Sequence, residues 1–379
     1  MTSQELSDAA GVISDNLACR LRLALLPGLG PRVLADLLER FGTAANVLAA
    51  DSTALRSVRN VGPKLVTAIR HADDHVDVPG ILQWCSANGA SLLASDSADY
   101  PPGLRELCDA PPILFVQGEI RPSDALAVAI VGTRHATVYG RTQAQRIAYG
   151  LAQAGITVVS GMARGIDSAA QQGALDGGGR TIAVFGCGLA YIYPPENAEL
   201  ATAIAANGAL VSEYHPQTKP HAGTFPQRNR LISGLSHATL VIEAPERSGA
   251  LITARTAQEQ GREVLALPGP VTSRASQGTN LLIRDGAKLV RNVEDILESL
   301  GPLAQAVPVA DGREVHHPAE ALLNDRECCV LDAITTEPIS IDAIVRTCRL
   351  PVAQVLATIS VLEIRKLIRR LSNQYVSRV

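Results

Sequence analysis

Apolar and polar positions follow two different rhythms along the 379 residues of this chain. From residue 17 to 75, apolar residues recur every three to four positions, as in "VLADLLERF" (33–41), which is typical of amphipathic helices. From residue 125 to 300, short continuous apolar runs alternate with helical stretches. Continuous apolar strands separated by helices are typical of a parallel sheet covered on both faces. The pattern therefore predicts a small helical domain followed by an α/β domain.

Seven apolar runs in the second region have the composition of strands, and we expect each to form one strand of the sheet. They are "LAVAIV" (126–131), "ITVVS" (156–160), "TIAVFG" (181–186), "ALVSEY" (209–214), "ATLVIEA" (238–244), "EVLALPG" (263–269) and "AKLV" (287–290). The predicted fold is a Rossmann-like, doubly wound, mostly parallel sheet. Ligands on such sheets bind at the carboxyl ends of the strands.

Changes in composition place the expected domain boundaries. Residues 1–75 form the helical domain, and residues 76–300 form the Rossmann-like domain. The Pro-rich segment 76–122 is its N-terminal connector, with strand candidates "SLLA" and "ILFVQG". Residues 301–320 have the composition of a linker. The last segment, 321–379, combines two helices, "IDAIVRTC" and "VAQVLATISVLEIRK", with a hairpin, which predicts a winged-helix domain.

Both terminal domains have features that fit DNA binding and have a plainer explanation as well. The turns "PGLGPR" (27–32) and "NVGPK" (60–64) each precede a helix, which resembles a pair of helix-hairpin-helix units or a SAM-like domain. Such turns expose N–H groups to a DNA phosphate, but Gly and Pro also serve simply to reverse the chain. The tail of the winged helix has two similar interpretations, a wing that faces DNA or an ordinary charged surface. It contains one acidic residue, Glu363, and five basic ones, Arg365, Lys366, Arg369, Arg370 and Arg378.

Composition narrows the class of protein. The net charge is −3, so a site for a polyanion must be a local concentration of Arg and backbone N–H groups. Seven Cys without C-x-x-C spacing fit reduced thiols and argue against a disulfide framework or a structural zinc. No apolar run reaches membrane-spanning length, and the first residues lack the regions of a signal peptide. We expect a cytoplasmic protein with no membrane contact, no metal and no cofactor.

The turn after the first strand has the form of a phosphate site. "AIVGTR" ends a strand at Gly132 and leads through Thr133 and Arg134 into a helix, and helix N-termini favour anions. A dinucleotide site would read G-x-G-x-x-G, with an acid after the second strand. Here the second glycine is missing, and the second strand ends in Ser160 and Gly161. The pattern argues against a dinucleotide oxidoreductase.

Three segments at strand ends offer groups that bind phosphates. Arg134 follows the first strand, and "SGMARGID" (160–167) follows the second and contains Arg164. "FPQRNR" (225–230) precedes the fifth strand and contains Arg228, Asn229 and Arg230. Glycines allow close approach of a backbone, and Arg forks match phosphate oxygens. If the strands are ordered as in other doubly wound sheets, the three segments converge on one edge, which suits a chain of phosphates.

Aromatic residues make up only 3% of the chain, so Phe225 and Tyr139 beside these segments are notable. A ring beside a basic groove can stack on bases of any sequence, although Phe225 can equally be a core residue. Catalytic signals are weak. Asp167 and Glu243 could act as an acid/base pair, but Asp167 begins a helix, which it can simply cap. No G-x-S-x-G supports a Ser-His-Asp arrangement.

Many separate motifs between residues 100 and 298 closely resemble the DNA-processing protein A family (DprA, also called Smf). They include "IVGTR…YGR", "VVSGMARGIDSAAQQGAL", "GGRTIAVFGCGLAYIYPPEN", "FPQRNRLISGLS", "ERSGALITARTAQEQGREVLALPG" and "GTNLLIRDGAKLV". Small departures are Thr133, where Ser is common, and Met162, where Leu is common. Neither removes a charge from the expected site.

The resemblance implies a protein that binds single-stranded DNA and loads the RecA recombinase onto it, in natural transformation or other recombination. It also implies a homodimer formed through the Rossmann-like domain and no catalytic chemistry. The DNA-phosphate pocket it implies comprises Gly132, Thr133, Arg134, Gly161 and Arg164, beside a basic wall of Phe225, Gln227, Arg228, Asn229 and Arg230. For such a protein, Arg134 and Arg228 are expected to be the main phosphate contacts. The alternative is a nucleotide-binding or nucleotide-hydrolysing enzyme that uses the same edge.

Overall fold

The computed structural model describes residues 15–301, 325–334, 339–348, 350–364, 367–370 and 375–378. Two members of the predicted basic tail, Arg365 and Lys366, lie outside the described residues. The side chains of Arg370 and Arg378 also lie outside them. Within the described residues, no helix is both long enough and apolar enough to cross a membrane.

The N-terminal region is helical, as the periodicity predicts. Its helices are α2 (Asp15–Ala24), α3 (Pro31–Phe41), α4 (Ala44–Ala49), α5 (Ser52–Arg56), α6 (Pro63–Arg70) and α7 (Ala72–His75). Their buried faces share a hydrophobic core that includes Leu23, Leu34 and Val66. The two glycine turns end where α3 and α6 begin, each with Pro at its first position, where a missing N–H costs no hydrogen bond.

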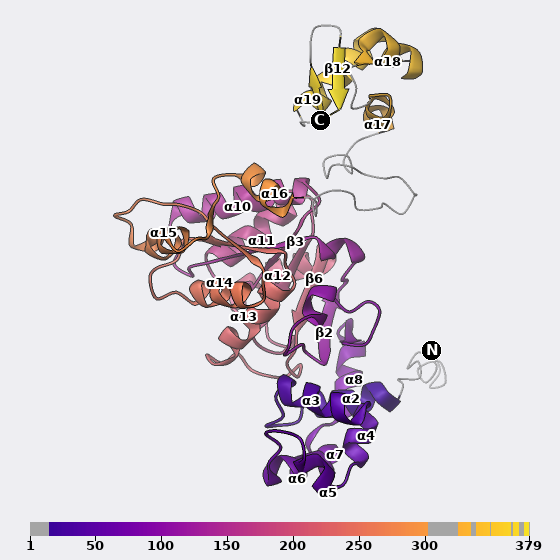
Figure 1. Ribbon diagram of the computed structural model, residues 1–379, viewed down its shortest axis with the longest axis vertical. Coiled ribbons are helices and arrows are strands. Elements are labelled where there is room, and N and C mark those ends of the chain that lie inside the picture. Colours follow the sequence, from indigo (N-terminus) through magenta and orange to yellow (C-terminus); the bar gives the residue numbers. More distant parts are fainter. Residues whose placement is uncertain are drawn as a thin grey trace.

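A mostly parallel sheet organises the middle of the chain (Figure 1). Its strands, in the order β1-β2-β6-β5-β4-β3-β7-β8-β9, are β1 (Ala90–Ala94), β2 (Ile113–Gly118), β3 (Ala127–Gly132), β4 (Thr157–Ser160), β5 (Thr181–Val184), β6 (Gly208–Ser212), β7 (Ala238–Ile242), β8 (Glu263–Ala266) and β9 (Lys288–Leu289). The seven strands from β3 onward pair in parallel and are the seven runs predicted from the sequence. The connector strands β1 and β2 extend the sheet antiparallel through β6.

Helices cover both faces of the sheet, because side chains of a buried strand alternate between its faces. Val128 and Ile130 of β3 pack under α10 (Val138–Gln153), α11 (Ile166–Asp176) and α16 (Val293–Leu300). Ala129 and Val131 face α13 (Thr224–Gly234), α14 (Gly249–Glu259) and α15 (Gln277–Arg284) (Figure 1). The remaining helical segments are α8 (Val78–Ala87), α9 (Pro102–Arg105), η1 (Pro122–Ala125), η2 (Pro195–Asn197), α12 (Ala198–Asn207) and η3 (Arg274–Ser276).

The C-terminal segment has the predicted winged-helix elements. They are α17 (Asp325–Asp332), β10 (Ile339–Ser340), α18 (Ile341–Cys348), α19 (Val352–Ile364), β11 (Ile368–Arg370) and β12 (Tyr375–Arg378). The strands pair in the order β10-β12-β11, and Ile344, Val355 and Val376 lie in the hydrophobic core of this segment. Arg369 of the predicted basic tail is exposed on β11.

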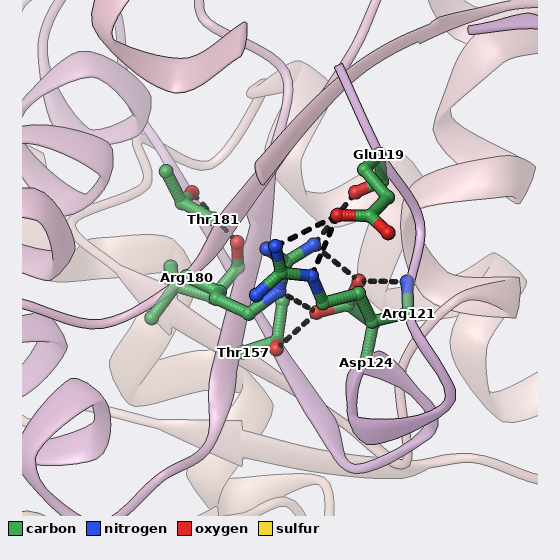
Figure 2. Close-up of polar contacts among 7 residues, drawn as sticks. Glu119, Arg121, Asp124, Thr157, Arg180 and Thr181 are labelled. Carbon is green, nitrogen blue, oxygen red and sulfur yellow. Dashed lines mark hydrogen bonds and ion pairs between the residues drawn. The ribbon is translucent and has the colours of Figure 1, made fainter. Parts of the chain in front are cut away.

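A buried ion pair joins the amino ends of three parallel strands (Figure 2). Both oxygens of Asp124 accept hydrogen bonds from Arg180, at 2.7 and 2.8 Å, and one of them also accepts from the Thr157 hydroxyl at 2.8 Å. The Arg121 N–H donates to the other oxygen, also at 2.8 Å. The carboxylate is therefore fully hydrogen-bonded, which offsets its desolvation and fixes η1 against β4 and β5.

Candidate functional site

The direction of chain crossover reverses between β3 and β7, which are neighbours in the sheet although far apart in sequence. Such a switch point leaves a crevice at the carboxyl ends of the strands. A cavity of about 620 Å³ lies there. Its lining comes from the turns after β3, β4 and β7 and from the first turns of α13 and α14, and includes Gly132, Arg134, Asp167, Phe225, Arg228, Asn229 and Arg247. The predicted convergence of the three segments is therefore found in the structure.

The turn after β3 is tightly packed. A Cβ on Gly132 would lie 2.0 Å from the carbonyl oxygen of Ile242, so only glycine fits beside β7. The Thr133 N–H donates to the carbonyl oxygen of Glu243 at 2.7 Å, and the Thr133 side chain is buried. Arg134 follows and is exposed at the edge of the cavity. The backbone is thus fixed up to Thr133, and the first free side chain is the arginine.

The turn after β4 packs directly against the turn after β3. Gly165 has a φ of +83°, and a Cβ on it would lie 2.4 Å from the Thr133 carbonyl oxygen, so both conformation and space require glycine. The Ile166 N–H donates to the same carbonyl at 3.3 Å. Helix α11 therefore begins beside Arg134, with its partial positive end at this edge of the sheet. Arg164 is exposed on the adjoining surface.

Arg228 lies beneath the cavity rather than on its rim. The residue is 3% exposed, and its guanidinium donates to the carbonyl oxygens of Gly161, at 2.9 Å, and Val184. Burial lowers the pKa of Arg228, and nearby Asp167 partly offsets that effect. These contacts fix α13 to the ends of β4 and β5. The expectation of Arg228 as a main phosphate contact stays a prediction, and the structure adds that the side chain is buried and that its Nη1 atom donates to the protein backbone.

The two candidate catalytic carboxylates both hold backbone in place. Asp167 accepts a hydrogen bond from the Gly161 N–H at 3.2 Å, and burial raises its pKa. Glu243 accepts from the Thr137 N–H at 2.8 Å, at the start of α10, and from the Thr137 hydroxyl. Each carboxylate therefore accepts a hydrogen bond from a backbone N–H group that a turn or a helix N-terminus would otherwise leave unpaired.

Arg134 and two aromatic rings form the rim of the cavity. The Arg134 guanidinium lies over the ring of Phe225, with 5.3 Å from its central carbon to the ring centroid. The Tyr193 ring is tilted against Phe225 at a centroid distance of 5.5 Å. Within the described part of the chain, no carboxylate forms an ion pair with Arg134. An exposed cation with no carboxylate at ion-pair distance, beside a partly exposed ring, is suited to a phosphate and its base.

The remaining predicted residues are distributed unevenly. Asn229 lines the cavity, whereas Gln227 lies outside the lining and its side-chain oxygen accepts from the Tyr214 hydroxyl at 3.3 Å. Arg230 is ion-paired with Glu213 and with Asp109, and it too lies outside the lining. The basic wall expected from "FPQRNR" is therefore not continuous, because successive helical residues point to different sides of α13. Tyr139 also lies outside this cavity.

Arg247 is a cavity residue that the sequence analysis did not select. It is exposed in the turn after β7, next to Ser248, whose hydroxyl caps α14 by accepting from the Ala250 N–H at 3.3 Å. "RSGA" after an apolar strand has the same form as the other strand-end turns, an arginine and a glycine before a helix. That signal could have identified Arg247 from the sequence.

Comparisons with known proteins confirm the resemblance found in the sequence. Residues 91–301 match the family model for DNA recombination-mediator protein A, and residues 314–374 match the DprA winged helix domain. Protein Smf of Synechocystis is 38% identical over 310 residues, which is 80% of this chain and 76% of that protein.

Two solved structures are similar over much of the chain. DNA processing protein A from Streptococcus pneumoniae has a TM-score of 0.63 and 32% identity, over 76% of this chain and 98% of that one. A structure on the single-stranded DNA binding mode of DNA processing protein A from Helicobacter pylori has a TM-score of 0.51 and 35% identity, over 56% of this chain and 95% of that one. These similarities support the mostly parallel α/β fold.

Proposed function

The chain belongs to the DNA recombination-mediator protein A family, and from this premise we propose that it binds single-stranded DNA as a recombination mediator. The Helicobacter pylori relative is described as a single-stranded DNA-binding protein, which supports the choice of ligand. The site at the carboxyl ends of β3, β4 and β7 is the proposed binding surface.

The observation that carries this proposal is the position of Arg134. Its guanidinium is exposed, has no carboxylate partner in the described part of the chain, and lies between the start of α11 and the Phe225 ring. A phosphate there would accept hydrogen bonds from the arginine fork and lie near the positive end of a helix. A neighbouring base would stack on Phe225. Because a phosphate and a ring are features of every nucleotide, binding should tolerate any sequence.

The other predicted residues have distinct roles in this proposal. Gly132 allows the backbone to pack closely against β7, Gly161 leaves room for the Arg228 guanidinium, and Thr133 fixes the turn that presents Arg134. Arg164 is a second phosphate contact on the adjoining surface, and Asn229 offers a polar side chain to the base or sugar. Arg228 acts as a positioning residue, because its buried guanidinium holds α13 and therefore Phe225 in place. Gln227 and Arg230 support the surrounding structure.

We further propose that the protein is not an enzyme, that it loads RecA onto single-stranded DNA, and that it acts as a homodimer. The lack of catalysis is supported by Asp167 and Glu243, whose oxygens accept hydrogen bonds from the backbone of neighbouring turns. RecA loading and dimerisation rest on membership of the family. RecA loading predicts that the protein increases the rate of ATP hydrolysis by RecA on DNA already covered by a single-strand-binding protein.

Fluorescence anisotropy of a labelled poly-dT oligonucleotide tests the central proposal. The intact protein is titrated at several salt concentrations, with duplex DNA and mononucleotides as competitors. We expect tight, salt-sensitive binding that neither competitor displaces, since phosphate contacts release counterions. A nucleotide-binding or nucleotide-hydrolysing protein is the alternative, because a cavity of about 620 Å³ also suits one small ligand. Displacement by a mononucleotide, or hydrolysis of one, would favour that alternative.

A further inference from the structure

A second cavity adjoins the first, next to the N-terminal halves of α10 and α11. It measures about 800 Å³, and Arg134 and His135 line both cavities. Its other polar lining residues come from the exposed sides of α10 and α11 and from the segment around η2: Arg141, Gln145, Arg164, Ser168, Gln172, Glu196, Asn197 and Glu199. We call this second cavity the α10–α11 groove. It continues the surface on which the Arg134 side chain lies.

The cations and neutral donors of the groove come from the turns after β3 and β4 and from α10 and α11, whereas its carboxylates come from η2 and α12. Arg134, Arg141 and Arg164 are exposed, and Gln145 on α10 and Gln172 on α11 line the same groove. The two carboxylates are Glu196, at the centre of η2, and Glu199, in the first turn of α12. Helix α11 also begins at this groove. A nucleic-acid backbone that leaves Arg134 would find its next donors here.

Glu196 occupies one of these donors. The Arg164 Nε and Nη2 atoms donate to the two carboxylate oxygens of Glu196, the second at 3.1 Å, so the pair has the fork-to-fork geometry. Both side chains remain about half exposed, at 53% and 52%. The ion pair raises the pKa of Arg164 and lowers that of Glu196. A carboxylate therefore fills the fork that a phosphate would otherwise fill, because the two anions have similar geometry.

The segment that carries Glu196 is anchored to the turn after β4. The Asn197 amide donates to the Met162 carbonyl oxygen at 2.9 Å, two residues before Arg164. Met162 has a φ of +53°, so the turn that presents Arg164 has a defined and uncommon conformation. Glu196 is thus placed opposite Arg164 by the backbone of both segments.

We propose that the α10–α11 groove is a second DNA subsite, and that Glu196 restricts it by occupying Arg164 until a phosphate displaces the carboxylate. This inference rests on the proposed binding of single-stranded DNA. The strand runs from the Phe225 cavity past Arg134 and into the groove. Because exposed ion pairs are weak, an incoming phosphate can exchange with Glu196. Because the Arg164–Glu196 ion pair must break before a phosphate can bind, the affinity for DNA is lower than it would be with Arg164 free. The restriction therefore limits the binding of strands too short to reach the groove from the Phe225 cavity.

Removal of the Glu196 charge tests the exchange. In poly-dT anisotropy titrations at low salt, Glu196→Gln should tighten binding by up to about five-fold, the range expected for release of an exposed ion pair. Glu199→Gln is the matched control, since it removes an equal charge from the same groove without touching the Arg164 pair. It should produce a smaller gain, from general electrostatics alone.

The double variant Arg164→Ala/Glu196→Gln shows whether the effect acts through Arg164. Compared with Arg164→Ala alone, it should gain no more affinity than Glu199→Gln gains in the intact protein. Equal gains from Glu196→Gln and Glu199→Gln, or a full gain that persists without Arg164, would overturn the inference while leaving the proposed function intact. If the unaltered protein fails to bind poly-dT, the proposed function fails instead. Melting temperatures of all variants should match, because the altered side chains are exposed.

Discussion

The Arg134 guanidinium lies over the face of the Phe225 ring, 5.3 Å from the ring centroid, although the two residues belong to different strand-end segments. This contact links the turn after β3 to the start of α13, next to the switch point between β3 and β7 where the direction of chain crossover reverses. The ring holds the flexible arginine in place without neutralising it, because a cation–π contact leaves the N–H groups at the edge of the guanidinium free.

Arg134→Ala should weaken binding of single-stranded DNA about equally for all sequences, because phosphate contacts carry no sequence information. The loss of one phosphate contact should also reduce the slope of log K against log salt by about 0.7. Anisotropy titrations with poly-dT and a mixed-sequence oligonucleotide measure both quantities. Arg121→Ala, at the opposite edge of the sheet, is the control and should change neither. Full affinity with an unchanged slope would remove Arg134 from the site.

Phe225→Ala should weaken binding by about 1–3 kcal/mol if the ring stacks on a base. The salt slope should stay the same, since the ring contacts no phosphate. Phe225→Tyr keeps the stacking face and should retain most of the affinity. The decisive comparison uses an oligonucleotide with abasic positions, to which the unaltered protein and Phe225→Ala should bind equally. If Phe225→Ala also weakens binding to the abasic strand, the ring acts through packing.

Local pattern was sufficient to predict most of the fold. Each strand from β3 to β9 is a short apolar run with helical periodicity on either side. The same residues therefore predict both that the run forms a strand and that the strand is buried. The strands β1 and β2 were also predicted, from "SLLA" and "ILFVQG". The antiparallel pairing of β2 onto β6 was not, because it depends on contacts with residues more than 90 positions later in the chain. The expected domain boundaries stay predictions.

The site was only partly predictable, because sequence shows which residues are near a strand end but not where their side chains point. Arg134 follows the end of β3 and Arg228 lies in α13 before β7, yet the first is exposed whereas the second is 3% exposed and bonded to carbonyls. Their difference arises from the position of Arg228 on the inner side of α13, above Gly161. The ion pair that holds Arg164 could not be foreseen either, since Glu196 comes from a separate segment.

Gly161→Ala should destabilise the fold, because the new methyl group would lie 2.3 Å from the Nη1 atom of Arg228. The buried guanidinium would have to move from its carbonyl partners, at a cost of about 1–3 kcal/mol for an overpacked site. Denaturant unfolding measures this cost. Gly249→Ala is a matched control at the first position of α14, where a Cβ would have nothing within 4 Å. That change should leave stability equal or slightly higher.

Asp124→Ala should be more damaging than either glycine change. It removes the buried acceptor of the Thr157 hydroxyl and of Arg180, whose guanidinium is itself only partly buried, so the cost should approach but not exceed the roughly 3–5 kcal/mol of breaking a fully buried pair. Asp124→Asn should cost less, since the amide keeps the shape and an acceptor oxygen for Thr157 (Figure 2). Urea unfolding measures the free energy of unfolding of the unaltered protein, Asp124→Ala and Asp124→Asn. Because this pair lies at the amino ends of the strands, folded Asp124→Asn should bind DNA normally, and a loss of binding would contradict that separation.

Deletion of residues 302–379 should leave affinity for single-stranded DNA unchanged. The proposed contacts lie between β3 and α14, and the winged-helix segment has its own hydrophobic core, so its removal exposes no core residue of the sheet. Anisotropy with poly-dT at two salt concentrations checks this, and a competition with duplex DNA checks the winged helix. If the deletion weakens binding to single strands and flattens the salt slope, the C-terminal segment supplies phosphate contacts of its own. If only duplex binding falls, the exposed Arg369 on β11 identifies a wing that contacts duplex DNA, separate from the sheet.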